Sequence, residues 1–264
     1  MKTALTIAGS DSGGGAGIQA DLKTFAAHGV YGTSAIAAVT AQNTVGVTAF
    51  VALPSDIIVA QMEAVASDIG VDAVKTGMLA NAAIVEAVAA AIDDLELPRV
   101  VVDPVMVAKS GDRLLEEEAV SAIRTELLRR ALVVTPNVPE AEVLAGMTIR
   151  SGSDAREAAR RILKLGPSAV IVKGGHLDGE EVVDLLYDGH AFTEFKGPRI
   201  ASRNSHGSGC TFAAALAANL ALGKALPEAT RLAKEYVVGA IRHGLPLGQG
   251  HGPMDHFWNG VARR

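Results

Sequence analysis

Cysteine is almost absent from the sequence: Cys210 is the only one in 264 residues, so no disulfide can form within the chain. A lone cysteine is typical of a protein of the reducing cytosol. Apolar runs are short, and none approaches the roughly eighteen residues of a membrane-spanning helix. The run Thr3–Gly9 is also too short for a signal peptide. We therefore expect a cytoplasmic protein that does not bind a membrane.

Blocks of lysine and arginine are missing as well. The chain has 24 Lys and Arg against 29 Asp and Glu, which gives a formal net charge of −5. An acidic chain without basic clusters is poorly suited to the phosphate backbone of nucleic acids, so we expect no nucleic-acid partner. Hydrophobic residues make up 49% of the chain and charged residues 20%, as in a compact globular protein.

The common nucleotide and metal motifs are lacking too. The pair Gly-Lys occurs once, at Gly223-Lys224, and Ala225 follows it, which excludes a Walker A loop. Gly15–Ala20 matches the loose dinucleotide pattern, but no acidic residue for a ribose follows the second predicted strand, which disfavours a dinucleotide-dependent oxidoreductase. The seven histidines form no recognisable metal motif, and we expect them at the surface or in loops.

Short apolar runs of the buried type alternate with helical patterns along the chain. The predicted strands are Ala4–Ala8, Thr33–Thr40, Ala73–Thr76, Arg99–Asp103, Leu132–Thr135 and Ala169–Lys173. The predicted helices include one capped by Ser55, one capped by Asn81, and Leu115–Arg130, Ser153–Leu165, Gly209–Leu222 and Glu228–His243. This order predicts an α/β fold, a mostly parallel sheet with helices on both faces, as a single domain over residues 1–264. Two strand-like segments around Asp188-Gly189 predict a hairpin, hence an antiparallel edge.

The segment Asn204–Thr211 runs into the apolar helix pattern Phe212–Leu222. Gly207, Ser208 and Gly209 leave the first N–H groups of that helix accessible, and these donors form a site suited to a phosphate. Cys210 lies inside this site. A thiol at a helix N-terminus has a lowered pKa and is partly thiolate. The alternative is that Cys210 is a small buried core residue, and the residues alone do not decide between the two.

Polar side chains follow the ends of the predicted parallel strands, where ligands bind in such sheets. They include Gln42, Asp103, Asn137, Glu140 and Lys173. Asp103 and Glu140 can hold Mg²⁺ through waters, and Lys173 can neutralise phosphate charge. Each also has a structural alternative, since Asp103 precedes a proline and Asn137 with Glu140 can cap a helix. Their concentration on one edge favours a functional site.

Together these motifs resemble the bacterial hydroxymethylpyrimidine/phosphomethylpyrimidine kinases of thiamine biosynthesis, which belong to the ribokinase-like superfamily. The resemblance covers nearly the whole chain and rests on Ala8–Thr24, Ala41–Thr44, Lys75–Leu79, Asp103–Met106, Ala108–Asp112, Thr135–Ala141, Lys173–His176, Asn204–Thr211 and Gly250–Pro253. It implies a three-layer ribokinase-like fold and a kinase that uses ATP and Mg²⁺. Its substrates would be 4-amino-5-hydroxymethyl-2-methylpyrimidine and then the monophosphate. The resemblance also suggests a homodimer.

The resemblance further implies roles for particular residues. Cys210 would be the base, where most of the superfamily carries aspartate, and Gly207, Ser208 and Gly209 would complete an anion hole. The pyrimidine pocket would be lined by Gly9, Asp21, Gln42, Met78 and Val105. The nucleotide phosphates and magnesium would be bound by Asp103, Asn137, Glu140 and Lys173. A pyridoxal kinase and a non-catalytic pyrimidine sensor on the same fold are the alternatives.

Overall fold

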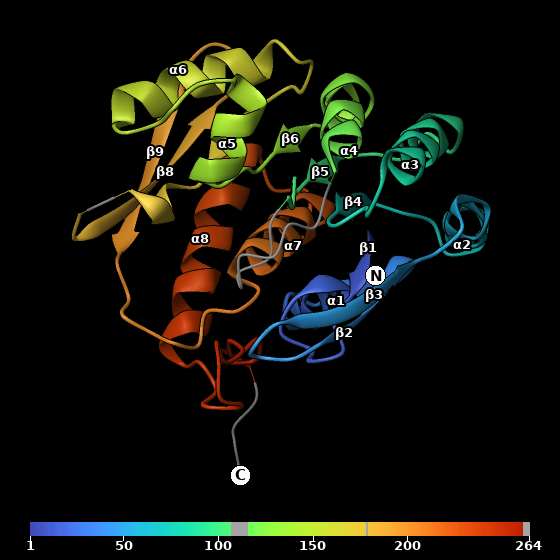
Figure 1. Cartoon of the computed structure of the whole chain (residues 1–264), viewed down its shortest axis with the longest axis horizontal. Helices are drawn as coiled ribbons and strands as arrows, with labels where there is room; N and C mark the ends of the chain where they lie inside the picture. Colours follow the sequence, from blue (N-terminus) through green and yellow to red (C-terminus); the bar gives the residue numbers. More distant parts are fainter. Residues whose placement is uncertain (107–115, 178, 261–264) are drawn as a thin grey trace.

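The computed structural model describes residues 1–106, 116–177 and 179–260 of the chain, and within these ranges nine strands form one sheet in the order β3-β2-β1-β4-β5-β6-β7-β8-β9 (Figure 1). The strands are β1 (Thr3–Ser10), β2 (Tyr31–Gln42), β3 (Val47–Ala52), β4 (Ala73–Thr76), β5 (Val100–Val102), β6 (Val133–Val134), β7 (Val170–Val172), β8 (Glu181–Tyr187) and β9 (Phe192–Pro198). The pairs from β2 through β7 are parallel, while β3 and the hairpin β8–β9 pair antiparallel at the two ends of the sheet.

Two layers of helices cover the sheet (Figure 1). The helices are α1 (Gly17–Ala27), α2 (Ser55–Asp68), α3 (Ala82–Asp94), α4 (Glu117–Ala122), α5 (Val138–Ala145), α6 (Gly152–Leu163), α7 (Ser208–Ala221) and α8 (Leu226–Arg242). Helices α1, α7 and α8 pack on one face, and α2 to α6 pack on the other. The predicted α/β fold with an antiparallel edge is therefore confirmed.

The two hydrophobic cores lie on opposite faces of the sheet, and the strands contribute side chains to both. In β7, Val170 and Val172 enter the core beneath α5 and α6, whereas Ile171 enters the core with α7 and α8. Because successive side chains of a strand point to opposite faces, a strand covered on both sides reads as a continuous apolar run. This is why the parallel strands could be found in the sequence.

Two local predictions were wrong, and one strand was missed. Strand β3 was not predicted, and it adds a second antiparallel edge. Ser55 is the first residue of α2 and does not cap it; Pro54 precedes the helix and no side chain caps it. The predicted helix Leu115–Arg130 is regular only over α4, then continues as a π-turn (Ile123–Leu127) and a 3-10 turn (Leu128–Arg130). Leu115 lies outside the described residues, as does the motif at positions 108–112.

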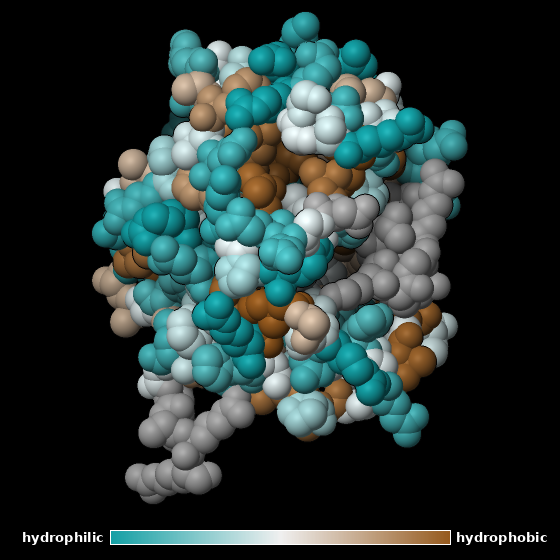
Figure 2. All heavy atoms as spheres, turned by 90° about the vertical axis from the view of Figure 1, so that its left-hand side faces the viewer, coloured by the Kyte–Doolittle hydropathy of each residue, from teal (hydrophilic) through white to brown (hydrophobic). Residues whose placement is uncertain are grey.

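Figure 2 shows mainly hydrophilic side chains on the protruding parts of one face of the protein. On the face in Figure 2, hydrophobic residues show mainly in recesses between them. None of the described helices has both the length and the hydrophobicity that a bilayer crossing needs.

Candidate active site

A pocket of about 680 Å³ lies at the carboxyl ends of the parallel strands. The predicted site residues that line it are Gly9, Gln42, Met78, Asp103, Val105, Asn137, Glu140, Lys173, Gly207, Ser208, Gly209 and Cys210. Asp21 is the exception. Its side chain is fully buried behind Lys75 and does not reach the pocket wall in this structure, so its role in the pyrimidine pocket stays a prediction.

The N-termini of two helices converge on Cys210. Helix α7 begins at Ser208, after Gly207 in the left-handed conformation with φ 79°. Helix α1 begins at Gly17, whose backbone N–H donates to the thiol. A Cβ on Gly207 would overlap the carbonyl oxygen of Gly15, so only glycine allows the two segments to approach this closely. The N–H groups and positive dipole ends of both helices therefore face the same end of the pocket.

The predicted low pKa of Cys210 is wrong. Burial raises the pKa of its thiol to about 11, against the lowering effects of the nearby Lys75 ammonium and the Gly17 N–H. The charges of Asp21 and Asp103 add to the rise. The helix begins where the sequence predicts, but the desolvation of the thiol has a larger effect on its pKa than the helix N-terminus has. This shift favours the neutral thiol in the free protein at neutral pH.

Lys75 forms the floor of this part of the pocket. Its Nζ lies 2.8 Å from Oδ2 of Asp21, and both side chains are 0% exposed. Burial alone would lower the pKa of Lys75, but the charge of Asp21, together with that of the Cys210 thiolate formed at high pH and that of Asp103, raises it above its ordinary value. Lys75 therefore places a buried positive charge below the thiol. Nothing in our prediction from the sequence assigned it a role, although a lysine inside an apolar strand was a signal that could have been used.

Asp103 and Lys173 form a second ion pair, at the other side of the α7 N-terminus. Lys173 Nζ lies 2.9 Å from Asp103 Oδ1, and the Thr135 hydroxyl lies 3.3 Å from the same oxygen. A Cβ added to Gly209 would lie 3.3 Å from Lys173 Nζ. The lysine thus lies directly beneath the glycine turn, close to where an anion bound by the turn would lie.

Asn137 and Glu140 cap α5. The Asn137 side chain accepts from the Glu140 N–H at 2.9 Å, and the Glu140 carboxylate accepts from the Asn137 N–H at 2.8 Å. Burial raises the pKa of Glu140 to about 7, with Lys173 lowering it and Asp103 raising it further. The structural alternative for these two residues is therefore correct, yet Glu140 still lines the pocket and faces the charges of Asp103 and Lys173.

The acidic residues fit a magnesium ion that keeps most of its waters. In the described ranges no group of three or more His, Cys, Asp or Glu side chains is placed to hold a metal. Two buried carboxylates, Asp103 and Glu140, line one side of the pocket, and the charge of Asp103 adds to the effect of burial in raising the pKa of Glu140. A pair of carboxylates that lacks further protein ligands suits Mg²⁺, which keeps waters and binds substrate phosphates.

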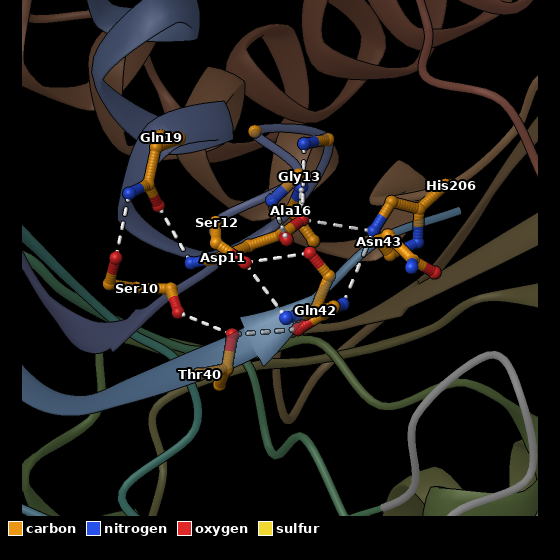
Figure 3. A network of polar contacts seen from close by, with 12 residues as sticks. Ser10, Asp11, Ser12, Gly13, Ala16, Gln19, Thr40, Gln42, Asn43 and His206 are labelled. Atoms are coloured by element: carbon orange, nitrogen blue, oxygen red, sulfur yellow. Dashed lines mark hydrogen bonds and ion pairs between the residues drawn. The ribbon is translucent and has the colours of Figure 1, made fainter. Parts of the chain in front are cut away.

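A third cluster lies at the end of β2 (Figure 3). His206 Nε2 is 3.0 Å from Asp11 Oδ2 and 3.3 Å from the Gln42 amide nitrogen, and all three residues line the pocket. The expectation that the histidines lie at the surface or in loops holds for His256 in that it lies in a turn, but its side chain is only 3% exposed and contacts Thr211 Oγ1. It is incomplete for His206, a loop residue that faces the pocket.

Comparison with known proteins agrees with these features. The phosphomethylpyrimidine kinase family matches residues 11–255. A hydroxymethylpyrimidine/phosphomethylpyrimidine kinase of Bacillus subtilis is 51% identical, with 96% of this chain and 94% of that protein covered. A thiamine biosynthesis bifunctional protein of Geobacter sulfurreducens is 53% identical over 96% of this chain, which spans only 52% of that longer protein.

Two solved structures share the fold. Phosphomethylpyrimidine kinase from Clostridium difficile 630 superposes with a TM-score of 0.82 at 45% identity, covering 91% of this chain and 100% of that one. An ADP complex of Bacillus subtilis pyridoxal kinase superposes with a TM-score of 0.91 at 43% identity, covering 97% of each chain. The ribokinase-like fold is thereby confirmed, and the chain belongs to the phosphomethylpyrimidine kinase family, whose members are phosphotransferases of thiamine biosynthesis.

Proposed function

We propose that this chain transfers the γ-phosphoryl group of ATP to the hydroxymethyl oxygen of 4-amino-5-hydroxymethyl-2-methylpyrimidine, and then a second one to the monophosphate. The observation that carries this proposal is the convergence of the α1 and α7 N-termini on Cys210, between the fully buried cation Lys75 and the partly buried cation Lys173. Phosphoryl transfer depends mainly on positioning and charge neutralisation, which such a site supplies.

The nucleotide end of the pocket would be formed by Lys173, Asp103, Asn137 and Glu140. ATP as the donor is supported by the related pyridoxal kinases, which were solved with ADP or AMP-PCP. Asp103 and Glu140 would hold Mg²⁺ through waters, and the bound ion would offset the charge of the phosphates. Lys173 lies beside Asp103, where it can contact the transferred phosphoryl group as a point cation.

The acceptor end would be formed by Gly9, Gln42, Met78 and Val105. A Cβ on Gly9 would lie 2.7 Å from Met78 Cε, so glycine leaves room for this side chain against the wall of the pocket. Gln42 can meet an aminopyrimidine edge with one donor and one acceptor, as amide side chains meet adenine. Apolar contacts with a flat ring and one amide pair would then orient the hydroxymethyl group.

Cys210 would accept the proton of the attacking hydroxyl. The thiol is neutral in the free protein, so its ionisation must accompany substrate binding or the reaction itself. Lys75 favours the thiolate electrostatically from below, and Asp21 holds Lys75 in place. The second acceptor is already a phosphate and needs no strong base, but it needs positive charge, which Lys75, Lys173 and the backbone N–H groups supply.

Pyridoxal kinase is the second candidate, because solved pyridoxal kinases superpose closely on this chain. The test is ATP-dependent phosphorylation of hydroxymethylpyrimidine and of pyridoxal by the same preparation. We expect the pyrimidine to have the higher kcat/KM. A preference for pyridoxal would overturn the assignment.

A homodimer and a cytoplasmic location remain part of the proposal. Exposed apolar residues on the β2–β3 edge support self-association, among them Val39 and its cross-strand partner Val51, which are 48% and 67% exposed. Sedimentation of the purified protein would give its mass in solution.

A further inference from the structure

Gln42 and His206 contact each other, and their neighbours restrict the orientation of the Gln42 amide as well as its position (Figure 3). His206 Nε2 lies 3.0 Å from Asp11 Oδ2 and 3.3 Å from the amide nitrogen of Gln42. At the opposite end of the amide, Oε1 of Gln42 lies 3.2 Å from Thr40 Oγ1. The Gln42 backbone is held by Ser12, whose hydroxyl donates to the Gln42 carbonyl and accepts from its N–H.

Asp11 determines where the hydrogen of His206 lies. Its carboxylate accepts backbone N–H groups from Gly13, Gly15 and Ala16. Burial alone would raise the pKa of Asp11, but the hydrogen bonds from His206, Ala16 and Gly13 lower it below its ordinary value. An ionised carboxylate has no hydrogen to donate. The Nε2 atom of His206 must therefore carry one, whether the ring is neutral or charged.

A protonated Nε2 has no lone pair to accept an amide N–H, and its one hydrogen, donated to Asp11, can be shared only with a second acceptor. The amide oxygen of Gln42 is therefore the atom that suits this position. The other end of the amide leads independently to the same orientation. Thr40 has one hydroxyl hydrogen, which it donates to the Ser10 carbonyl at 2.8 Å, so a lone pair is left for Gln42. A half turn of the amide about its terminal bond exchanges oxygen and nitrogen and satisfies both contacts.

We infer that His206 is a positioning residue that sets substrate specificity by holding the Gln42 amide with its oxygen toward His206 and its nitrogen toward Thr40. The inference rests on the proposed function, in which Gln42 binds the ring. The oxygen keeps one lone pair for a ligand, and the nitrogen keeps one hydrogen. The pocket therefore presents an acceptor near the start of α7 and a donor farther from it.

This order matches the substrate. In hydroxymethylpyrimidine, a ring nitrogen, the carbon with the amino group and the carbon with the hydroxymethyl group follow one another around the ring. The amino group would donate to the Gln42 oxygen, and the ring nitrogen would accept from the Gln42 N–H. The hydroxymethyl group would then lie on the side of His206, which directly precedes the Gly207–Cys210 turn.

The 4-oxo analogue of the same pyrimidine is the sharpest probe. Its carbonyl and ring N–H present acceptor and donor in the reverse order, so it fits only after the amide turns over. Turning it over would place the amide N–H groups against the hydrogen of His206. The protein should therefore bind the amino compound in preference to the oxo compound.

The experiment is calorimetric binding of both pyrimidines, without nucleotide, to the parent, His206→Phe, Gln42→Leu and the double variant. Removing His206 Nε2 should reduce the preference for the amino compound about tenfold, the worth of one hydrogen bond. In the Gln42→Leu background the same replacement should leave the preference unchanged, because there is no amide to orient. Thr40→Val should also reduce the preference, and the matched Thr40→Ser should keep it. If His206→Phe fails to fold, Thr40→Val and Thr40→Ser still test the orientation of the amide from its opposite end.

Several outcomes would overturn the inference. A preference that survives both His206→Phe and Thr40→Val would show that the amide is not oriented by its neighbours. An equal loss of preference with and without Gln42 would show that His206 only shapes the pocket. A parent that binds neither compound would overturn the proposed function and this inference together, whereas the first two outcomes leave the proposed function intact.

Discussion

Replacing Lys75 by methionine should strongly destabilise the protein. The change keeps most of the side-chain volume and removes the charge that compensates Asp21, 2.8 Å away in a fully buried pair. Removing one partner of such a pair costs about 3–5 kcal/mol. Asp21 Oδ2 would keep the Thr6 hydroxyl at 2.6 Å, but among the described residues Oδ1 has no hydrogen-bond partner. We therefore expect the upper part of that range, about 4–5 kcal/mol.

The pH dependence of the destabilisation shows whether the uncompensated charge of Asp21 causes it. Burial raises the pKa of Asp21 and Lys75 lowers it, so the pKa rises further when the lysine is lost. The folded variant then binds this proton more tightly than the unfolded chain. Its stability is fully present at acid pH and is lost as the pH rises through the folded-state pKa. The deficit relative to the parent should therefore be larger at mildly alkaline than at acid pH.

The assay is urea unfolding at several pH values, followed by the fluorescence of Trp258, the single tryptophan. The matched control is the double variant Asp21→Leu, Lys75→Met, which removes both charges and should recover most of the stability. A loss below about 1 kcal/mol, the value of an exposed pair, would refute the reasoning. A deficit that does not change with pH would refute it as well.

Three further outcomes are expected. Cys210→Ala should lose most of the turnover and keep ligand binding, because the anion site is largely backbone N–H; unchanged turnover would make Cys210 a packing residue. Gly207→Ala should destabilise more than Gly223→Ala in thermal unfolding, since both have positive φ but only Gly207 would overlap another segment; equal losses would contradict the close approach. At limiting Mg²⁺, turnover should rise with pH through about 7, because Glu140 must lose its proton to bind a cation; Glu140→Gln should abolish this rise, and a flat parent profile would argue against Glu140 as a ligand.

The parts of the fold that could be predicted are those in which burial leaves a pattern. Parallel strands such as β5 and β7 are covered on both faces, so their apolar runs are unbroken. Strand β3 is mostly exposed and still carries Phe50 and Val51, so neither an alternating nor a buried pattern marks it. Its pairing with β2 is a tertiary contact that the local sequence does not encode.

The candidate site shows the same division. Strand ends and the glycine turn could be placed from the sequence, because the carboxyl edge of a parallel sheet collects them. The pairing of Lys75 with Asp21 could not, since it joins a strand to a helix 54 positions away. The raised pKa of Cys210 depends on how deeply the turn is packed, which the helix N-terminus alone does not reveal. The contact of His206 with Gln42 likewise appears only once the chain is folded.

The most direct test of the central claim is product-resolved phosphorylation of hydroxymethylpyrimidine and of its monophosphate by the parent and by Lys173→Ala. We predict that the parent forms the monophosphate and then the diphosphate. The variant should lose more of the second step, because an anionic acceptor must approach the γ-phosphate of ATP beside this lysine. Equal losses in both steps would limit Lys173 to the nucleotide, and a parent that never forms the diphosphate would contradict the two-step assignment.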